Sequence, residues 1–273
     1  MSSLRAGVLV AALMAGATGA HAQIQLINDE TMAGANWSAS ILSQGGGFSF
    51  NTGNPASGGN PGAYRAISHA SVTGFTSGLV GHFHTTAWDP AEGELLGLSM
   101  GVDVNCFNGG TSNAVAFGLI IEQNGTIFFG PTFTALTGSG WRTDLRRTEL
   151  TAGNFVGAGS ATPDFTRDGA PLRFGFYSSN GTGNAAPISS SSGTDNFFVT
   201  LNVACAADLD LSGFVDSDDF VLFVAQFARG CTGAGQGPFG ADPACVKSAD
   251  FDRSGFVDSD DFVAFAQAFQ APC

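Results

Sequence analysis

Two aspartate-rich segments near the end of this 273-residue chain carry the side chains best suited to chemistry. Each places oxygen-bearing side chains at positions 1, 3, 5, 9 and 12 of a twelve-residue stretch, with glycine at position 6. This spacing lets one turn of backbone wrap a hard cation such as Ca²⁺, because the glycine permits the sharp bend and the carbonyl at position 7 adds a ligand. The predicted ligands are Asp208, Asp210, Ser212, Phe214, Asp216 and Asp219 in the first segment and Asp250, Asp252, Ser254, Phe256, Asp258 and Asp261 in the second. Because the second segment repeats the first at every ligand position, the sequence predicts two bound calcium ions.

A short amphipathic helix is predicted after each segment. Apolar residues recur there at i, i+3, i+4 and i+7, the pattern of one buried helix face. They are Phe220, Phe223, Val224 and Phe227 after the first segment and Phe262, Phe265, Ala266 and Phe269 after the second. We expect these faces to pack one repeat against the other. No helix is predicted before either segment, because residues 201–207 are typical of a strand end and residues 231–245 are rich in glycine and proline.

This loop-and-helix unit, used twice and with Asp rather than Glu at position 12, resembles the dockerin modules of secreted bacterial proteins. The flanking cysteines, with Gly230-Cys231 ending the first repeat, resemble the cysteine-bearing "GC-type" variant. The resemblance covers residues 204–273 and implies a cohesin-like or cell-surface protein as partner. In that family the partner contacts the start of each helix, at loop positions 10 and 11. Here those positions are Ser217-Asp218 and Ser259-Asp260.

Four of the five cysteines lie in this tail, and four cysteines allow three disulfide connectivities. The two ends of dockerin-like modules lie together, so the resemblance favours Cys205–Cys273 with Cys231–Cys245. Pairing within each repeat, Cys205–Cys231 with Cys245–Cys273, is equally symmetric and stays open. Cys106 lies in an apolar run with no basic residue near it in sequence, so we expect a buried thiol rather than a nucleophile.

The charge of the chain is concentrated in the tail. The net charge is −13, and from residue 206 onward 11 Asp and 3 basic residues give −8. Two calcium ions would offset much of this charge. The acidity argues against a nucleic-acid partner, which requires basic patches.

Residues 1–22 have the features of a cleaved signal peptide. Arg5 precedes an apolar run over residues 6–17, and Ala20-His21-Ala22 supplies a small-x-small cleavage site. The run is shorter than the about 20 apolar residues that span a bilayer, and no other segment is long enough. We therefore expect an extracellular or cell-surface protein without a transmembrane segment.

The segment of residues 23–203 has the pattern of a β-sandwich. Short β-rich runs cover residues 48–51, 95–104, 114–123, 126–130, 172–177 and 196–203, and turns rich in Gly, Asn and Pro separate them. Asn124-Gly125, between two apolar runs, is the strongest hairpin signal. The expected fold class is mainly β: a jelly-roll β-sandwich, followed over residues 204–273 by a small α-type, dockerin-like module of two calcium-loop–helix units.

Four phrases of this segment, residues 60–65, 98–103, 171–177 and 194–201, resemble the jelly-roll modules of secreted bacterial proteins. That broad group includes laminin-G-like and carbohydrate-binding domains. The resemblance implies a binding or presenting module with polysaccharide as a partner. The side chains available for stacking on sugar are Trp37, Tyr64, Trp88 and Trp141, with Arg65 and Arg142 beside two of them.

Other polar groups leave alternatives open. His82 and His84 share one face of a strand and, with Asp89, could hold a metal, although paired strand histidines are the simpler interpretation. Asp29, Glu30 and Asp195 could hold a structural calcium ion. Glycoside hydrolysis needs two carboxylates across one bond, and the candidates are Glu92, Glu94, Asp103 and Glu122. We expect a non-catalytic protein; a structural surface protein without a small ligand and an unrecognised polysaccharide-active enzyme are the alternatives.

Overall fold

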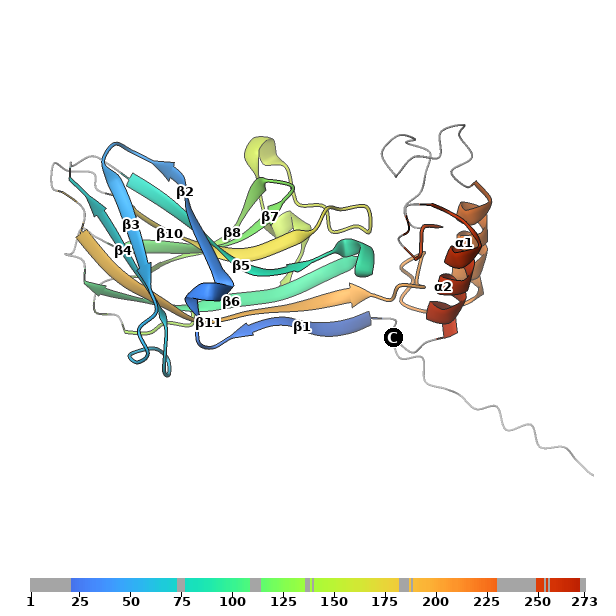
Figure 1. Cartoon of the computed structure of the whole chain (residues 1–273), viewed down its shortest axis with the longest axis horizontal. Helices are drawn as coiled ribbons and strands as arrows, with labels where there is room; N and C mark the ends of the chain where they lie inside the picture. Colours follow the sequence, from blue (N-terminus) through green and yellow to red (C-terminus); the bar gives the residue numbers. More distant parts are fainter. Residues whose placement is uncertain are drawn as a thin grey trace, which may run out of the picture.

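The computed structural model describes residues 21–72, 77–108, 114–135, 138, 140–181, 187, 189–229, 249–252, 254 and 256–270. They form two β-sheets followed by two helices (Figure 1). The strands are β1 (His21–Asp29), β2 (Trp37–Gln44), β3 (Phe48–Gly53), β4 (Arg65–Ser71), β5 (Ser77–Trp88), β6 (Leu95–Asn108), β7 (Val115–Gln123), β8 (Thr126–Ala135), β9 (Arg146–Leu150), β10 (Leu172–Gly181) and β11 (Ser189–Ala204). The helices are α1 (Ser217–Arg229) and α2 (Ser259–Gln270). Within these residues, no helix combines the length and the apolarity needed to cross a membrane.

The strand order is that of a jelly roll. One sheet runs β3-β4-β11-β6-β9 and the other β2-β5-β10-β7-β8, and each described pairing is antiparallel. From β4 to β11, the strands β4, β11, β6 and β9 face β5, β10, β7 and β8, and the chain crosses between the sheets at each connection except the β7–β8 hairpin, as in a jelly roll. The prediction of a mainly β, jelly-roll sandwich is confirmed.

The β7–β8 hairpin turns at Asn124-Gly125. Both residues have positive φ, 51° and 76°, as a primed two-residue turn requires. Glycine adopts this conformation without a Cβ clash, and asparagine tolerates it better than other side chains. The hairpin expected from the sequence is therefore present.

The long strand β11 is the spine of the first sheet. It pairs with β6 along one edge. Its other edge is shared, because β4 pairs with residues 189–194 and β1 with residues 197–204. The pairing with β6 shifts between Asp195 and Phe198, where Asn196 has a φ of 51°. This bulge divides the strand into two halves.

The space between the sheets is apolar over most of its length and polar at one end. Phe117, Phe174, Phe197 and Val104 are fully buried in the apolar part, and Cys106 is buried with them, as predicted. Side chains from β4, β5, β10 and β11 bury polar groups at the other end. They are Arg65, His69, Ser71, His82, Ser178, Asn180, Ser190, Ser192 and Thr194.

The two helices of the tail lie side by side (Figure 1). Phe223 and Phe265 are fully buried and stack with ring centroids 4.0 Å apart and an interplanar angle of 1°. The repeats therefore pack on each other as predicted. The buried stripe is narrower than predicted, since Phe220, Val224 and Phe262 are each 41% exposed.

Candidate functional site

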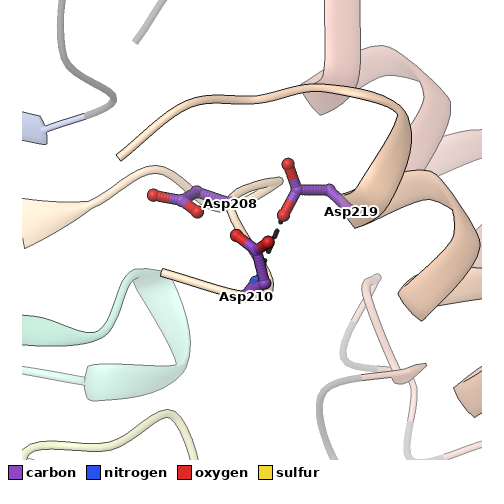
Figure 2. A group of neighbouring side chains, drawn as sticks. All are labelled: Asp208, Asp210 and Asp219. Carbon is purple, nitrogen blue, oxygen red and sulfur yellow. Dashed lines mark hydrogen bonds between the residues drawn. The ribbon is translucent and has the colours of Figure 1, made fainter. Parts of the chain in front are cut away.

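Three aspartates converge in the first acidic loop. Asp208 and Asp210 come from the start of the loop and Asp219 from the first turn of α1 (Figure 2). One carboxylate oxygen from each residue lies within 4.8 Å of the others. Asp208 and Asp219 are fully buried, whereas Asp210 is exposed. The loop thus gathers three negative charges at one point.

Hydrogen bonds from the backbone hold these carboxylates in place. Asp219 accepts the N–H of Leu209 at 2.7 Å on one oxygen and that of Asp216 at 2.9 Å on the other. Asp208 accepts the N–H of Gly213 at 3.1 Å through Oδ2, while its buried Oδ1 has no hydrogen-bond donor among the described residues. Burial, and then the nearby charges of Asp219 and Asp210, raise the pKa of Asp208. A buried oxygen without a donor, beside two further carboxylates, fits a bound divalent cation.

The other predicted ligands of this loop have different surroundings. The hydroxyl of Ser212 lies 3.3 Å from the carbonyl oxygen of Phe214, so the oxygens of positions 5 and 7 are adjacent. Asp216, at position 9, lies outside the group of three, and its carboxylate accepts the N–H of Asp218 at 2.8 Å. Asp216 therefore caps α1. Position 9 of calcium loops often reaches the ion through a water molecule, which is compatible with this capping role.

The second loop repeats this geometry. Carboxylate oxygens of Asp250, Asp252 and Asp261 lie within 4.8 Å of one another. The hydroxyl of Ser254 lies 3.3 Å from the carbonyl oxygen of Phe256. Asp258 accepts the N–H of Asp260 at 2.9 Å and so caps α2. Two independent copies thus present the same oxygens.

Several predictions about the ends of the chain fall outside the described residues. Cys205 is buried just after β11, but Cys231, Cys245 and Cys273 are not among the described residues, so both disulfide connectivities remain predictions. The same holds for residues 1–20 of the signal peptide. Its last two residues, His21 and Ala22, begin β1, and cleavage after Ala22 would shorten that strand by two residues.

A chain of hydrogen bonds crosses the polar end of the sandwich. The Nε2 atoms of His69 and His82 each lie 3.0 Å from the Ser178 hydroxyl, and Nε of Arg65 lies 3.4 Å from Nδ1 of His82. Arginine can only donate, so His82 accepts at Nδ1 and donates from Nε2 to Ser178, whose hydroxyl donates to His69. Burial lowers the pKa of His69 to about 4 and that of His82 well below its usual range. Both histidines are therefore neutral at pH 7.

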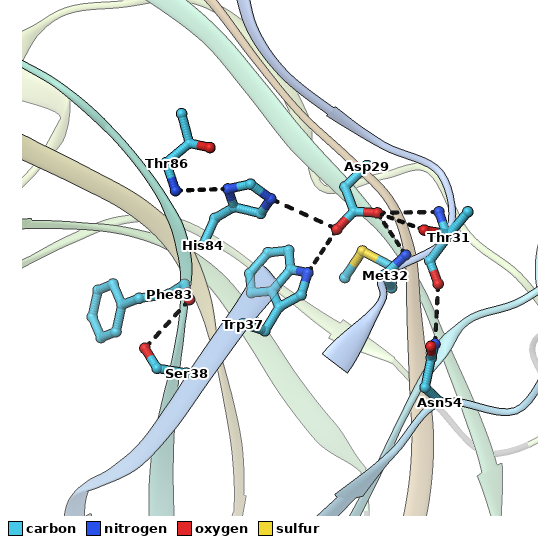
Figure 3. A network of polar contacts seen from close by, with 9 residues as sticks. All are labelled: Asp29, Thr31, Met32, Trp37, Ser38, Asn54, Phe83, His84 and Thr86. Carbon is cyan, nitrogen blue, oxygen red and sulfur yellow. Dashed lines mark hydrogen bonds and ion pairs between the residues drawn. The ribbon is translucent and has the colours of Figure 1, made fainter. Parts of the chain in front are cut away.

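His84 pairs with Asp29 rather than with Asp89 (Figure 3). One oxygen of Asp29 accepts the indole N–H of Trp37 at 2.9 Å and lies 3.7 Å from His84 Nε2, and the other accepts the N–H of Met32 at 2.7 Å. Burial alone would raise the pKa of Asp29, but hydrogen bonds from Trp37, Met32 and Thr31 lower it. Its oxygens are thus already paired.

Neither alternative metal site is assembled. Asp195 accepts backbone N–H groups of Asn60 and Asn196. Among the described residues, the only metal-sized groups of acidic, His or Cys side chains are the two in the tail. The histidine site with Asp89 and the site with Asp29, Glu30 and Asp195 are therefore not formed here.

The candidate catalytic carboxylates do not face one another. Asp103 projects from the outer face of one sheet, where Arg146 donates two hydrogen bonds of 2.8 and 2.7 Å to it. Glu122 projects from the outer face of the other sheet and pairs with Arg173 at 2.6 Å. Glu92 lies in the short 3-10 helix Pro90–Glu92, and Glu94 lines a cleft with Arg167. The sandwich separates Asp103 from Glu122, so these two cannot flank one glycosidic bond.

A nucleophile-elbow spacing occurs at Gly97-Leu98-Ser99-Met100-Gly101, but the context is wrong for one. Ser99 lies in the middle of β6 and pairs regularly with Thr200, whereas an elbow needs a sharp turn from strand to helix. The lining of the shallow pocket beside Ser99, all of it described, includes Glu149 but no histidine.

The four aromatic candidates for sugar binding divide into two pairs. Trp37 and Trp88 are core residues, 7% and 6% exposed. Tyr64 and Trp141 lie with Phe107 in an edge-to-face cluster on the outer face of the first sheet, with ring centroids 5.4 to 6.0 Å apart. Phe107 was not among the predicted residues, although its alternation with Asp103 and Asn105 in the sequence places it on that face.

A glycine and a hydrogen bond fix this outer aromatic cluster, Tyr64–Phe107–Trp141. A Cβ atom at Gly193 would lie 2.8 Å from the ring of Tyr64 and 2.9 Å from that of Phe107, so both rings rest on bare backbone. The indole N–H of Trp141 donates to the carbonyl of Gly58 at 3.0 Å. The rings are thus ordered before any ligand binds.

The fold and these sites define a two-sheet β-sandwich followed by two acidic loop–helix units. No protein-family model and no curated protein sequence matches the chain. Among solved structures, the chain is similar to a family 11 carbohydrate-binding module from Clostridium thermocellum in complex with a beta-1,3-1,4-mixed-linked tetrasaccharide. The sequences are 13% identical, the alignment covers 68% of this chain and 98% of that chain, and the TM-score is 0.38. It is also similar to the CBM22-1 xylan-binding domain of Paenibacillus barcinonensis Xyn10C, with 13% identity, 66% and 96% covered, and a TM-score of 0.36. A third similar structure is the mannan-recognising module TmCBM27, with 10% identity, 66% and 98% covered, and a TM-score of 0.36. Similarities this weak carry no argument about a ligand, and the jelly-roll architecture rests on the strand order itself.

Proposed function

We propose that this chain is an exported, non-catalytic binding protein whose β-sandwich, residues 23–203, is attached through a calcium-loaded, dockerin-like module, residues 204–273. The observation that supports it best is the convergence of Asp208, Asp210 and Asp219 within 4.8 Å, with one oxygen of Asp208 buried and without a donor among the described residues. A calcium ion would pair with that oxygen and offset the repulsion among the carboxylates. The equivalent residues of the second loop, Asp250, Asp252 and Asp261, would hold a second ion.

Calcium titration with two optical signals tests this proposal. All three tryptophans, Trp37, Trp88 and Trp141, belong to the sandwich, whereas both described α-helices belong to the tail. Chelation should therefore remove the helical circular dichroism and one calorimetric transition, while the tryptophan emission stays unchanged. An unchanged pair of transitions after chelation would refute the proposal.

A matched pair of variants makes the test specific to the carboxylate group. Asp208→Asn removes a converging carboxylate, and we expect calcium affinity to fall about tenfold or more. Asp218→Asn makes the same change of charge one residue before Asp219, at an exposed side chain outside the group. Calcium affinity should then change by no more than about twofold. Equal effects of the two variants would mean that general acidity, not ligation, binds the ion.

The proposed docking surface lies on the exposed start of each helix. Val221 and Val263 are 64% and 51% exposed although they are apolar, and each lies one turn after the positions at which a dockerin-like partner would bind. Changing both valines to Asp should abolish binding of a cohesin-like partner while calcium-dependent helix content is kept. Binding of the double variant at wild-type affinity would exclude this surface.

The outer aromatic cluster favours carbohydrate as a second ligand of the same protein. Preordered, partly exposed rings can stack on sugar faces at small entropic cost. A glycan array probed with the wild-type chain and with Trp141→Ala tests this. We expect polysaccharide binding that Trp141→Ala weakens about tenfold or more. Absence of binding to any glycan would favour a structural surface protein without a small ligand.

A further inference from the structure

A pocket opens between the edge strands of the two sheets, at the polar end of the sandwich. Trp37 and Ala39 of β2, residues 50–53 of β3 and Arg65 of β4 form most of its lining, and its volume is about 410 Å³. None of the residues that line it carries a carboxylate. It belongs neither to the acidic loops nor to the outer aromatic cluster.

Arg65 is a buried cation of this pocket without an anionic partner. Its side chain is 3% exposed, and none of the ion pairs among the described residues includes it. Nε donates to His82, the guanidinium lies over the Trp37 ring at 5.8 Å, and the two terminal nitrogens donate no hydrogen bond to any described residue. Burial lowers the pKa of Arg65 to about 10, and the negative charge of Asp29 partly opposes this shift, so the group is charged at neutral pH.

The neighbouring side chains position Arg65 without neutralising it. His82 and His69 are uncharged, and their hydrogen bonds through Ser178 leave Nδ1 of His82 free to accept from Arg65. The negative charge of Asp29 reaches Arg65, but the oxygens of Asp29 form no ion pair with it and are engaged by the Trp37 N–H, His84 and Met32 (Figure 3). The terminal nitrogens of Arg65 are not among the fully buried polar atoms without a partner, so they face the pocket, where an anion that enters could accept their hydrogen bonds.

We propose that this pocket binds the carboxylate of an acidic sugar, with Arg65 as the anion-binding residue. A guanidinium offers two parallel donors that match a carboxylate, and the terminal nitrogens of Arg65 are available for this. Phe50, which is half-buried, supplies aromatic surface for a sugar ring, and Thr52 and Asn54 supply polar groups for hydroxyls. The proposal is independent of calcium binding in the tail and of the outer aromatic cluster.

Titration of the full calcium-loaded chain with glucuronate, acetate and glucose tests the proposal. Trp37 lines the pocket, so tryptophan emission reports occupancy, and calorimetry measures affinity. We expect saturable binding of glucuronate, at least about tenfold weaker binding of acetate, and no binding of glucose. Arg65→Met should weaken glucuronate binding at least about tenfold. Arg173→Met, the same change on the outer face of the other sheet, should leave it unchanged.

A second variant keeps the proposal testable if Arg65→Met does not fold. Thr52→Glu places a carboxylate within the pocket, where it would pair with Arg65. We expect this variant to fold with a higher unfolding midpoint and to lose glucuronate binding. Four results would overturn the proposal: no binding of glucuronate to the wild-type chain, equal binding of glucose, retained binding by Arg65→Met or Thr52→Glu, or binding of acetate as tight as that of glucuronate. If the tail did not bind calcium but the chain still bound glucuronate, the proposal for this pocket would stand.

Discussion

The neutral histidines at the polar end of the sandwich should make its stability depend strongly on pH. Burial lowers the pKa of His69 from 6.5 to about 4. A histidine whose folded-state pKa is depressed stabilises the fold fully above the unfolded-state pKa, and this stabilisation is lost as the pH falls from 6.5 to about 4. At 1.36 kcal/mol per pKa unit, protonation of His69 alone lowers the free energy of unfolding by about 3 kcal/mol. That is a large share of the 5–15 kcal/mol of a typical domain.

Urea unfolding followed by tryptophan emission measures this effect in the sandwich alone. His69→Gln removes the titrating group and keeps a polar atom near the Ser178 hydroxyl. Between pH 7 and pH 4, the wild-type chain should lose about 3 kcal/mol more than the variant, because contributions of the carboxylates are common to both and cancel. Ser178→Ala should lower stability at both pH values but keep most of the pH dependence, because burial and not the hydroxyl depresses the pKa of His69. Parallel stability curves for the wild type and His69→Gln would refute the reasoning.

Three further substitutions probe other parts of the chain. Arg146→Met leaves the fully buried carboxylate of Asp103 without its cation. Urea unfolding should show that the free energy of unfolding falls by about 2–3 kcal/mol, at the low end for such pairs because Arg146 is itself 43% exposed. A decrease below about 0.5 kcal/mol would contradict a stabilising ion pair. Phe223→Ala removes one ring of the stacked pair in the tail and should lower the free energy of unfolding of the tail by about 3–5 kcal/mol. The melting temperature followed by helical circular dichroism should fall, while the transition followed by tryptophan emission stays unchanged. A change in both transitions would mean that the tail and the sandwich unfold together. Gly125→Ala forces a side chain into a φ of 76° and should cost about 1 kcal/mol in urea unfolding, and an unchanged midpoint would argue against the primed turn.

The acidic loops could be predicted residue by residue because their geometry is local. All the predicted ligands of one loop lie within twelve residues, so the spacing in sequence determines which oxygens meet. The one difference in detail is Asp216, which caps α1 and lies outside the group of three. Position 9 is also the residue before the helix, and a carboxylate there is the preferred helix cap. The sequence alone does not separate these two roles.

The strands at the polar end of the sandwich could not be predicted in the same way. Strand β4 places Arg65, His69 and Ser71 on its inner face, and β5 places His82 and His84 there. Apolar/polar alternation marks a strand only where its inner face is apolar, so these two strands lack that signal. The apolar runs of β6, β7 and β10 were predicted because these parts of the strands bury apolar side chains such as Val104, Phe117 and Phe174.

The position of Arg65 illustrates why the pocket was not predictable from the chain. Beside Tyr64, Arg65 suggested a surface residue that assists sugar stacking. Tyr64 directly precedes β4, which begins at Arg65, and the side chains of these two neighbours lie on opposite faces of the sheet. Tyr64 therefore joins the outer cluster, while Arg65 enters the interior and meets His82, which the jelly-roll order brings to it from the facing sheet. The charge of Arg65 becomes informative only once this pairing across the sheets is known, because the same guanidinium on the surface would be paired with water and would indicate no ligand.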